Sequence, residues 1–411
     1  MTIIFHIELL LNSAVLWGKY FVLLFSDLKQ ATQFFDFSLF DSLASITLFV
    51  IIPLILCFRR KKFSWLKEVI NFPIIVLLIL FFAFCFAPLI TNENPDFQKD
   101  LKVTKLLSPF SSVKVIHLNK EGQNGSSSTE GFRFYKDEVI KPSFDESLIF
   151  ADKVEISIDH ILYWQKDLQK KLGFSEVKTE NGKPDIGEKT FILGTDEFGR
   201  DIFTRLIYGA RISLLVGIGS VFVSLIIGLA IGFIAGLKGG VIDMIFSRIT
   251  DLFLAFPVIY LIILILAMFG NSLFSVIFVL GFSGWMSLFK IVKSEVISAK
   301  NKDYIISAGL LGLNRFSILT KEILPVIIVP VIVNIIFQFS NVILAESALS
   351  YLGLGSGNSY PSWGSMIESG QQYITKAWWM IFFPGLILIL TIFSVNDLGK
   401  RLNKLFNPAV H

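Results

Sequence analysis

Charged residues are scarce in this sequence, and their scarcity excludes an ordinary soluble protein. Asp, Glu, Lys and Arg make up 17% of its 411 residues, and 53% are hydrophobic, whereas a soluble domain carries about 25% charged residues. The mean hydropathy is +0.67. We therefore expect an all-α polytopic membrane protein, with the lipid bilayer as its surroundings.

Cysteines and catalytic motifs are also nearly absent. The two cysteines, Cys57 and Cys85, lie inside apolar runs, where a thiol behaves as a small hydrophobic group, so no disulfide framework is expected. The sequence contains no HExxH, GxSxG or CxxC motif, and no GxxxxGK(S/T) loop that would cradle the phosphates of ATP. We therefore expect a non-catalytic chain without catalytic residues, metal ligands or a cofactor of its own.

Eight apolar runs can be interpreted as membrane spans, each of which needs about 20 residues, or seven if the first only lies in the interface. Extra N-terminal segments are expected in residues 1–68, and the first core helix in residues 69–92. Positive residues collect in the cytoplasm, so the basic cluster at residues 59–62 and the basic C-terminal tail are predicted there. The runs are residues 3–25, 42–58, 69–90, 211–237, 250–269, 271–293, 326–349 and 377–396.

A polar segment of mixed charge, residues 93–193, interrupts the apolar runs. We expect it to form an extracytoplasmic α+β domain inserted between two spans. Residues 132–140 predict a strand, residues 156–173 a helix that ends at a glycine, and Asn181-Gly182 a hairpin turn. Its acidic and basic residues nearly balance, so nucleic acid is not expected as a partner.

The sequence LGTDEFGRD begins at Leu193 and leads into a span. With Thr195 or Asp196 as the N-cap, Phe198, Ile202 and Leu206 recur every fourth residue. This spacing favours an interfacial helix at residues 194–210 on the outer side; a surface helix of the polar domain is the alternative. The predicted outer interfacial motif comprises Gly194, Thr195, Asp196, Gly199, Arg200 and Asp201.

Small residues recur every fourth position in the span at residues 211–237. In lipid, helices associate mainly through close backbone approach over such faces, so this span is predicted to pack tightly in a bundle; lining a transport path is the alternative. The small residues are Ser220, Ser224, Gly228, Gly232 and Gly236.

Polar residues also follow one side of the span at residues 326–349. Asn334, Gln338 and Asn341 are spaced i, i+4 and i+7, and Glu346 lies near the outer end. Such side chains bond neighbouring helices or face a hydrated path, and the spacing alone does not choose between them; a translocation path is our hypothesis. The spans in residues 250–396 contain no ionisable residue near the middle of the membrane, where ion-coupled carriers usually place one. Transport would therefore need energy from a partner.

A charged loop, residues 294–325, separates two uncharged apolar runs and is predicted to face the cytoplasm. Its sequence predicts a helix that ends near Leu311, a turn at Gly312 and a second helix. The small residues Ala308 and Gly309 would let this knob seat closely in a groove of another protein.

Over residues 193–408 the sequence resembles the C-type subunit of the oligopeptide, dipeptide and nickel group of ABC-transporter permeases. The matching stretches include LGTDEFGRD, YGARISLLVG, DLFLAFP, ESALSYLGLG, WGSMI and FPG. The resemblance implies a type I importer core of six transmembrane helices, five of them in residues 211–411. It also implies that the charged loop is the EAA loop, which couples to an ATPase, with Asp303, Tyr304, Ser307, Ala308, Gly309, Gly312, Leu324 and Pro325 at the motif positions.

Two departures from the family pattern stand out. Ser307 replaces the motif glutamate and Gly309 its second alanine, and Phe191-Ile192 replaces the usual His-Pro before LGTD. A charged contact of the loop is therefore expected to be missing.

The resemblance implies a permease subunit in the cytoplasmic membrane of a bacterium, with its C-terminus in the cytoplasm. The implied partners are a B-type permease subunit, two cytoplasmic ATPase subunits that bind ATP and Mg, and an extracytoplasmic substrate-binding protein. The implied substrate is a peptide. Nickel or another small solute is the alternative within the class, and an ATP-independent carrier or channel is the alternative from another class.

Overall fold

The computed structural model describes residues 71–91, 93–119, 145–157, 159–180, 182–314, 317–355 and 361–406. The predicted spans at residues 3–25 and 42–58, the strand at residues 132–140 and Asn181 lie outside these residues. The chain divides into two compact units. One contains Leu80–Arg211 and Ser369–Pro384, and the other contains Ile70–Ile79, Ile212–Glu368 and Gly385–His411.

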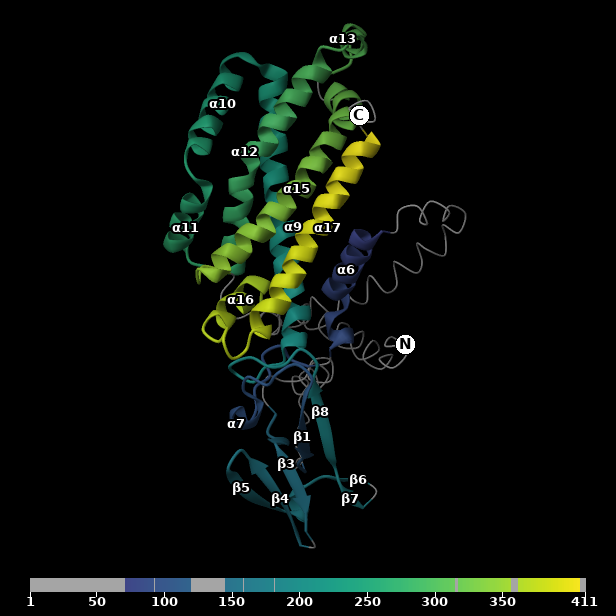
Figure 1. The fold of residues 1–411 in the computed structure, drawn as a ribbon. Coiled ribbons are helices and arrows are strands. Elements are labelled where there is room, and N and C mark those ends of the chain that lie inside the picture. Colours follow the sequence, from purple (N-terminus) through teal and green to yellow (C-terminus); the bar gives the residue numbers. More distant parts are fainter. Residues whose placement is uncertain are drawn as a thin grey trace, which may run out of the picture. The chain divides into compact units, whose positions relative to one another are not determined.

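Long apolar helices dominate the described part of the chain (Figure 1), as the sequence predicts. Four are long and apolar enough to cross a membrane, two further helices bent at a short break count as a fifth span if they are taken together, and one shorter apolar helix precedes them. The predicted core of apolar α-helices is therefore confirmed. These helices are α6 (Phe72–Ile90), α9 (Ile202–Lys238), α10 (Gly240–Ala255), α11 (Val258–Phe269), α12 (Leu273–Lys300), α15 (Leu324–Tyr351), which continues a π-helical turn, η3 (Ile318–Ile323), and α17 (Trp379–Phe406).

The span expected at residues 250–269 is not one continuous helix. α10 begins at Gly240, ends at Ala255, and makes an angle of 89° with α11. Pro257 lies at the break, and Phe256 before it is extended, with φ −91° and ψ 141°. A proline disfavours the helical conformation of the preceding residue, so the sequence itself contains the cause of the bend.

The small-residue face of α9 packs on α12, as the spacing of four predicts. Ser224 Oγ donates a hydrogen bond of 2.6 Å to the carbonyl oxygen of Gly281. A Cβ added at Gly232 would come within 2.7 Å of Val292 Cβ. Gly228 and Gly236 repeat this approach one helical turn to either side, against Leu288 and Val296.

α12 and α15 pack against each other through buried apolar side chains. Buried residues of both helices join in one apolar cluster that also takes in the segment between them. The connecting segment is therefore mounted on two packed helices. The cluster comprises Leu288, Val292, Val296, Ala299, Ile305, Ile323, Ile327 and Val331.

The polar insert is mainly β structure. An antiparallel sheet has the order β2-β1-β8, a second has the order β3-β4-β5, and β6 pairs with β7. Buried residues of both larger sheets, such as Ile116 and Ile161, share an apolar core. The elements are α7 (Leu101–Thr104), β1 (Ser111–His117), β2 (Leu148–Ala151), β3 (Lys153–Ile156), β4 (His160–Gln165), β5 (Leu168–Gly173), η2 (Phe174–Glu176), β6 (Thr179–Glu180), β7 (Lys183–Pro184) and β8 (Ile186–Phe191).

The helix predicted at residues 156–173 is wrong, because β4 and β5 form a hairpin there. Burial alternates along β4: Ile161, Tyr163 and Gln165 are buried, and the residues between them are partly exposed. This period of two is the strand pattern. Lys166 has a φ of 54° and opens the two-residue turn between the strands.

Candidate functional site

The segment between α12 and α15 folds as a helix, a turn and a second helical segment. α13 (Asp303–Leu310) ends where the backbone N–H of Leu311 donates to the carbonyl oxygen of Ser307, at 3.0 Å. Gly312 follows with a φ of 84°, the left-handed conformation that ends many helices. Asn314 Oδ1 accepts from the backbone N–H of Ser317 at 2.6 Å and caps the next helical segment.

One face of α13 is packed and the other is exposed. Ile305 and Ala308 are 5% and 8% exposed, and Ile305 belongs to the cluster of α12 and α15. Leu310 and Leu311, at the end of α13, are each 84% exposed. Figure 1 shows α13 at the top of the picture, beyond the end of α12. The loop therefore presents an apolar tip on a packed base.

The sequence analysis assigned the contact of this loop to its motif positions and missed the apolar tip. Asp303 and Ser307 are exposed, Tyr304 is 46% exposed, and Leu324 and Pro325 belong to the first turn of α15. Gly309 lies within α13. The pair Leu310-Leu311 beside Gly312 was the available signal in the sequence, because turns lie at the surface and expose their side chains.

The LGTDEFGRD stretch is a compact turn, so the helix predicted from residue 194 is wrong at its start. Helix α9 begins only at Ile202 and continues to Lys238. Asp201, rather than Thr195 or Asp196, caps it, because its carboxylate accepts from the backbone N–H of Thr204 at 2.9 Å.

Thr195, Asp196 and Arg200 of this turn all form side-chain hydrogen bonds. Asp196 Oδ1 accepts from the backbone N–H of Arg200, and Asp196 Oδ2 accepts from Arg200 Nε at 2.6 Å. Thr195 Oγ1 donates to the carbonyl oxygen of Thr104, and Trp379 Nε1 donates to the carbonyl oxygen of Thr195 at 3.1 Å. The turn therefore ties the insert to the first residues of α17.

The glycines of this turn are required by its shape. Gly194 and Gly199 have φ values of 81° and 70°, which other residues seldom adopt. A Cβ at Gly194 would lie 2.9 Å from Trp379 Nε1, and one at Gly199 would overlap the side chain of Thr104. The two glycines let the turn approach its neighbours closely.

Two carboxyl groups in the turn are shifted by burial. Burial raises the pKa of Asp201, although hydrogen bonds from Thr204 oppose the shift. Burial and the charge of Asp196 raise the pKa of Glu197. In both groups, burial therefore makes the charged form less stable than it would be in water.

Arg211 is a residue that sequence reasoning missed. It is 1% exposed, and its Nε donates to the carbonyl oxygen of Phe84 in α6 at 2.7 Å, while Nη2 donates to that of Cys85 at 3.0 Å. Pro88 has no N–H to offer the carbonyl of Phe84, four residues before it. The proline in an apolar run was the available signal, because it leaves a carbonyl that another group must satisfy.

The predicted path residues occupy different environments. Gln338 is 8% exposed and its Nε2 donates to Ser224 Oγ at 2.6 Å, whereas Asn341 is exposed. Asn334 Nδ2 lies 3.4 Å from Ser287 Oγ. Two buried amide oxygens, those of Asn334 and Gln338, have no hydrogen-bond partner in the described part of the chain.

Glu346 is fully buried among serine hydroxyls. Ser350 Oγ donates to its Oε1 at 2.7 Å, and Ser213 Oγ to its Oε2 at 3.3 Å. Ser213 Oγ also accepts from the backbone N–H of Trp363 at 3.3 Å. Glu346 thus connects α9 and α15 to α16 (Trp363–Gln371).

Within the described residues, no cluster of three or more His, Cys, Asp or Glu side chains could hold a metal ion.

Three relatives match about half of this chain and most of their own length. The dipeptide transport system permease protein DppC of Bacillus subtilis (strain 168) is 38% identical over 233 residues, 56% of this chain and 72% of the relative. The di/tripeptide transport system permease protein DppC of Pseudomonas aeruginosa (strain UCBPP-PA14) is 35% identical over 224 residues, which are 54% of this chain and 74% of the relative. The oligopeptide transport system permease protein OppC of Haemophilus influenzae (strain ATCC 51907 / DSM 11121 / KW20 / Rd) is 36% identical over 216 residues, which are 53% of this chain and 70% of the relative.

The family described as binding-protein-dependent transport system inner membrane component matches residues 228–411. The chain belongs to this family. The predicted resemblance is therefore confirmed, and the chain is a multi-pass permease of the inner membrane. In this permease, the loop between α12 and α15 and the polar residues of α15 lie inside the matched region, and the LGTDEFGRD turn precedes it.

Proposed function

We propose that this chain is the permease subunit through which an ATP-driven importer moves peptides across the cytoplasmic membrane. The names of the three relatives support peptides as the substrate. The proposed assembly contains a B-type permease subunit, two cytoplasmic ATPase subunits that bind ATP and Mg, and an extracytoplasmic binding protein. Nickel or another small solute, and transport without ATPases, are outcomes that the experiment below separates.

The observation that carries the coupling role is the exposed tip at Leu310 and Leu311, each 84% exposed. Exposed contiguous apolar residues on a polar loop mark a contact with another protein. We assign this tip, together with the exposed residues Asp303, Tyr304 and Ser307 of α13, to a contact with a groove of the ATPase subunit. Since Ser307 carries no charge, apolar contact would supply most of the affinity.

The packed base of the loop explains how a partner's movement would reach the membrane. Ile305 and Ile323, on either side of the tip, lie in the same buried cluster as Val292 and Ile327 of the adjoining helices. A push on the tip would therefore move α12 and α15 as a rigid pair rather than bend the loop. Such movement would open the path alternately to either side.

The charge distribution supports a cytoplasmic position for the loop. Lys300 Nζ donates to the carbonyl oxygen of Leu237, so the ends of α9 and α12 meet beside α13. Lys290 forms an ion pair of 3.0 Å with Asp251, and Lys293 one with Asp243. The excess of lysine at this end fits the positive-inside rule. The C-terminus, after the basic end of α17, would lie on the same side.

Gln338 and Asn334 remain the predicted lining of the transport path, together with Asn341 and Glu346. The buried amide oxygens of Gln338 and Asn334 need donors that the described residues do not offer. Either water in a path or the B-type subunit would satisfy them. This requirement favours a partner or solvent at α15.

Reconstitution into vesicles tests the proposal. Vesicles that contain this chain, the B-type subunit and both ATPases, with the binding protein outside, should accumulate a tripeptide only when ATP is present inside. Uptake by vesicles that lack the ATPase subunits would refute the coupled mechanism, and uptake of nickel but no peptide would refute the substrate.

A further inference from the structure

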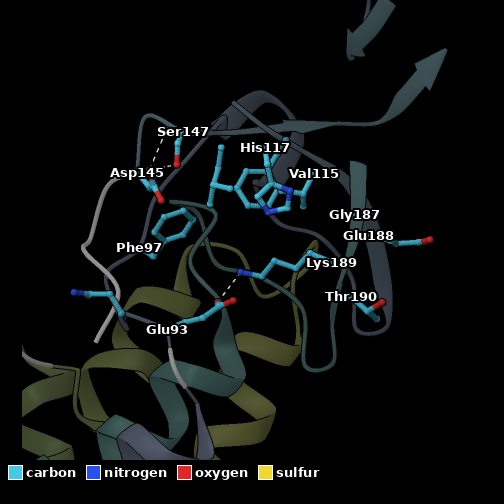
Figure 2. A pocket seen from close by; sticks show the side chains of 13 residues that line it. Glu93, Phe97, Val115, His117, Asp145, Ser147, Gly187, Glu188, Lys189 and Thr190 are labelled. Carbon is cyan, nitrogen blue, oxygen red and sulfur yellow. Dashed lines mark hydrogen bonds and ion pairs between the residues drawn. The ribbon is translucent and has the colours of Figure 1, made fainter. Parts of the chain in front are cut away.

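The insert contains a cavity of about 540 Å³. It is formed by β1, β2, β8 and the segment that follows α6, and Figure 2 shows its side chains. The volume lies within the range of about 300–1,000 Å³ that is usual for small-ligand sites. Phe150 and Val115 are buried at its wall, 2% and 6% exposed, so one side of the cavity is apolar.

A caged cation occupies another side of this cavity. Lys189 Nζ lies 2.6 Å from Glu93 Oε2. The same ammonium group stands over the rings of Phe97, Phe150 and Phe191, at 5.5, 5.7 and 4.9 Å from their centres. Aromatic faces attract cations, so a carboxylate within such rings is a receptor for an ammonium group, and the chain fills it with its own lysine (Figure 2).

A smaller cavity of about 280 Å³ adjoins the same ion pair. It shares Glu93, Lys189 and Thr190 with the larger cavity and reaches Asp201 and Thr204. Burial has the largest effect on the pKa of Asp201 and raises it, while the charge of Lys189 lowers this pKa and the charge of Glu93 raises it. Glu93, Lys189 and Asp201 therefore line the same small cavity.

The lining favours a positive ligand over a negative one. The cavity lining includes the carboxylates of Glu93 and Asp145, and Lys189 is its only lysine or arginine. The side chain of Glu188 points away from Lys189 (Figure 2). A ligand carboxylate would meet repulsion from both acids and from the aromatic faces, whereas an ammonium group would replace Lys189 at Glu93.

We propose that this cavity binds the free α-ammonium group of a peptide at Glu93, in exchange for Lys189, with the first apolar side chain of the peptide against Phe150 and Val115. The assignment rests on the proposed peptide import and adds a recognition site outside the membrane helices. It gives the insert a role in holding the amino end of the substrate.

Calorimetric titration of the full-length chain in detergent micelles tests the site. The probes are L-leucyl-L-leucinamide, which has a free amine and no carboxylate, and its N-acetyl derivative, which lacks the charge. The free amine should bind at least tenfold more tightly than the acetylated probe. Equal affinities, or no binding of either probe, would overturn the assignment.

Three variants separate ion exchange from a structural effect. Glu93→Gln should weaken binding of the free amine at least tenfold, and Lys189→Met should tighten it, because the internal competitor is gone. Glu155→Gln, which removes an exposed carboxylate paired with Lys153 in another sheet, should change nothing. Weaker or unchanged binding to a folded Lys189→Met chain, judged by its thermal unfolding, would contradict the exchange.

The peptide-import proposal has an independent readout. If the reconstituted importer takes up peptide but the chain does not discriminate the two probes, the cavity assignment fails and the import function stands. If the chain binds the free amine selectively while the importer moves no peptide, the import function fails, and the cavity remains an ammonium site.

Discussion

Close contact between α9 and α12 makes a quantitative prediction for Gly232→Ala. The added Cβ would lie 2.7 Å from both Val292 Cβ and Val292 Cγ1, and 3.3 Å from the backbone nitrogen of Lys293. Carbon atoms prefer separations of about 3.5–4.0 Å, so the helices must separate by about 1 Å. Overpacking of this kind costs about 1–3 kcal/mol, against a gain of about 1 kcal/mol in helix propensity.

Gly385→Ala is the matched control for this prediction. Gly385 also lies inside a long apolar helix, α17, but no atom comes within 4 Å of its added Cβ. It should therefore gain about 0.5–1 kcal/mol in helix stability without any clash. In detergent unfolding of the isolated chain, Gly385→Ala should be more stable than Gly232→Ala by about 1–3 kcal/mol. Equal stabilities would refute the packing of α9 on α12.

Two further predictions concern the first turn of α9 and its contact with α6. Burial raises the pKa of Asp201, so its contribution to the free energy of unfolding is full below its unfolded pKa of about 3.9 and is lost as the pH rises through its folded pKa. Asp201→Asn keeps the helix cap and should remove this part of the pH dependence of unfolding. An unchanged pH profile would contradict the assignment. Arg211→Leu should cost about 1–3 kcal/mol, because the carbonyl of Phe84 loses its donor; denaturant unfolding that matches the unmodified chain would show that the carbonyl finds another partner.

The sequence predicted the long helices and the α9 contact because both depend on local patterns. Apolar length sets a span, and the four-residue spacing of Gly228, Gly232 and Gly236 sets a face. The hairpin of β4 and β5 was misread because the apolar residues of that stretch fit a helical face as well as alternating strand positions. Only the partner strand β3 and the shared core decide between them.

Other features depend on contacts between distant residues. The bond from Arg211 to Phe84 joins residues 127 positions apart, and the cage around Lys189 draws on Glu93 and Phe97, nearly a hundred positions away. No local pattern connects such groups. The bend at Pro257 and the apolar tip at Leu310 and Leu311, by contrast, were visible in the sequence, where a proline and a leucine pair beside a glycine mark them.

Gly312→Glu tests whether the loop between α12 and α15 binds the ATPase subunits, and Gly353→Glu is its control. Both glycines have positive φ, 84° and 76°, and open space at Cβ, so the substitutions carry the same strain and charge. Gly353 follows the other end of α15, beyond Tyr351. The measurement is the amount of ATPase subunit that co-purifies with the tagged permease. We expect the Gly312→Glu permease to lose the ATPase subunits and the Gly353→Glu permease to keep them. Equal retention by the two variants would show that the loop is not the docking site.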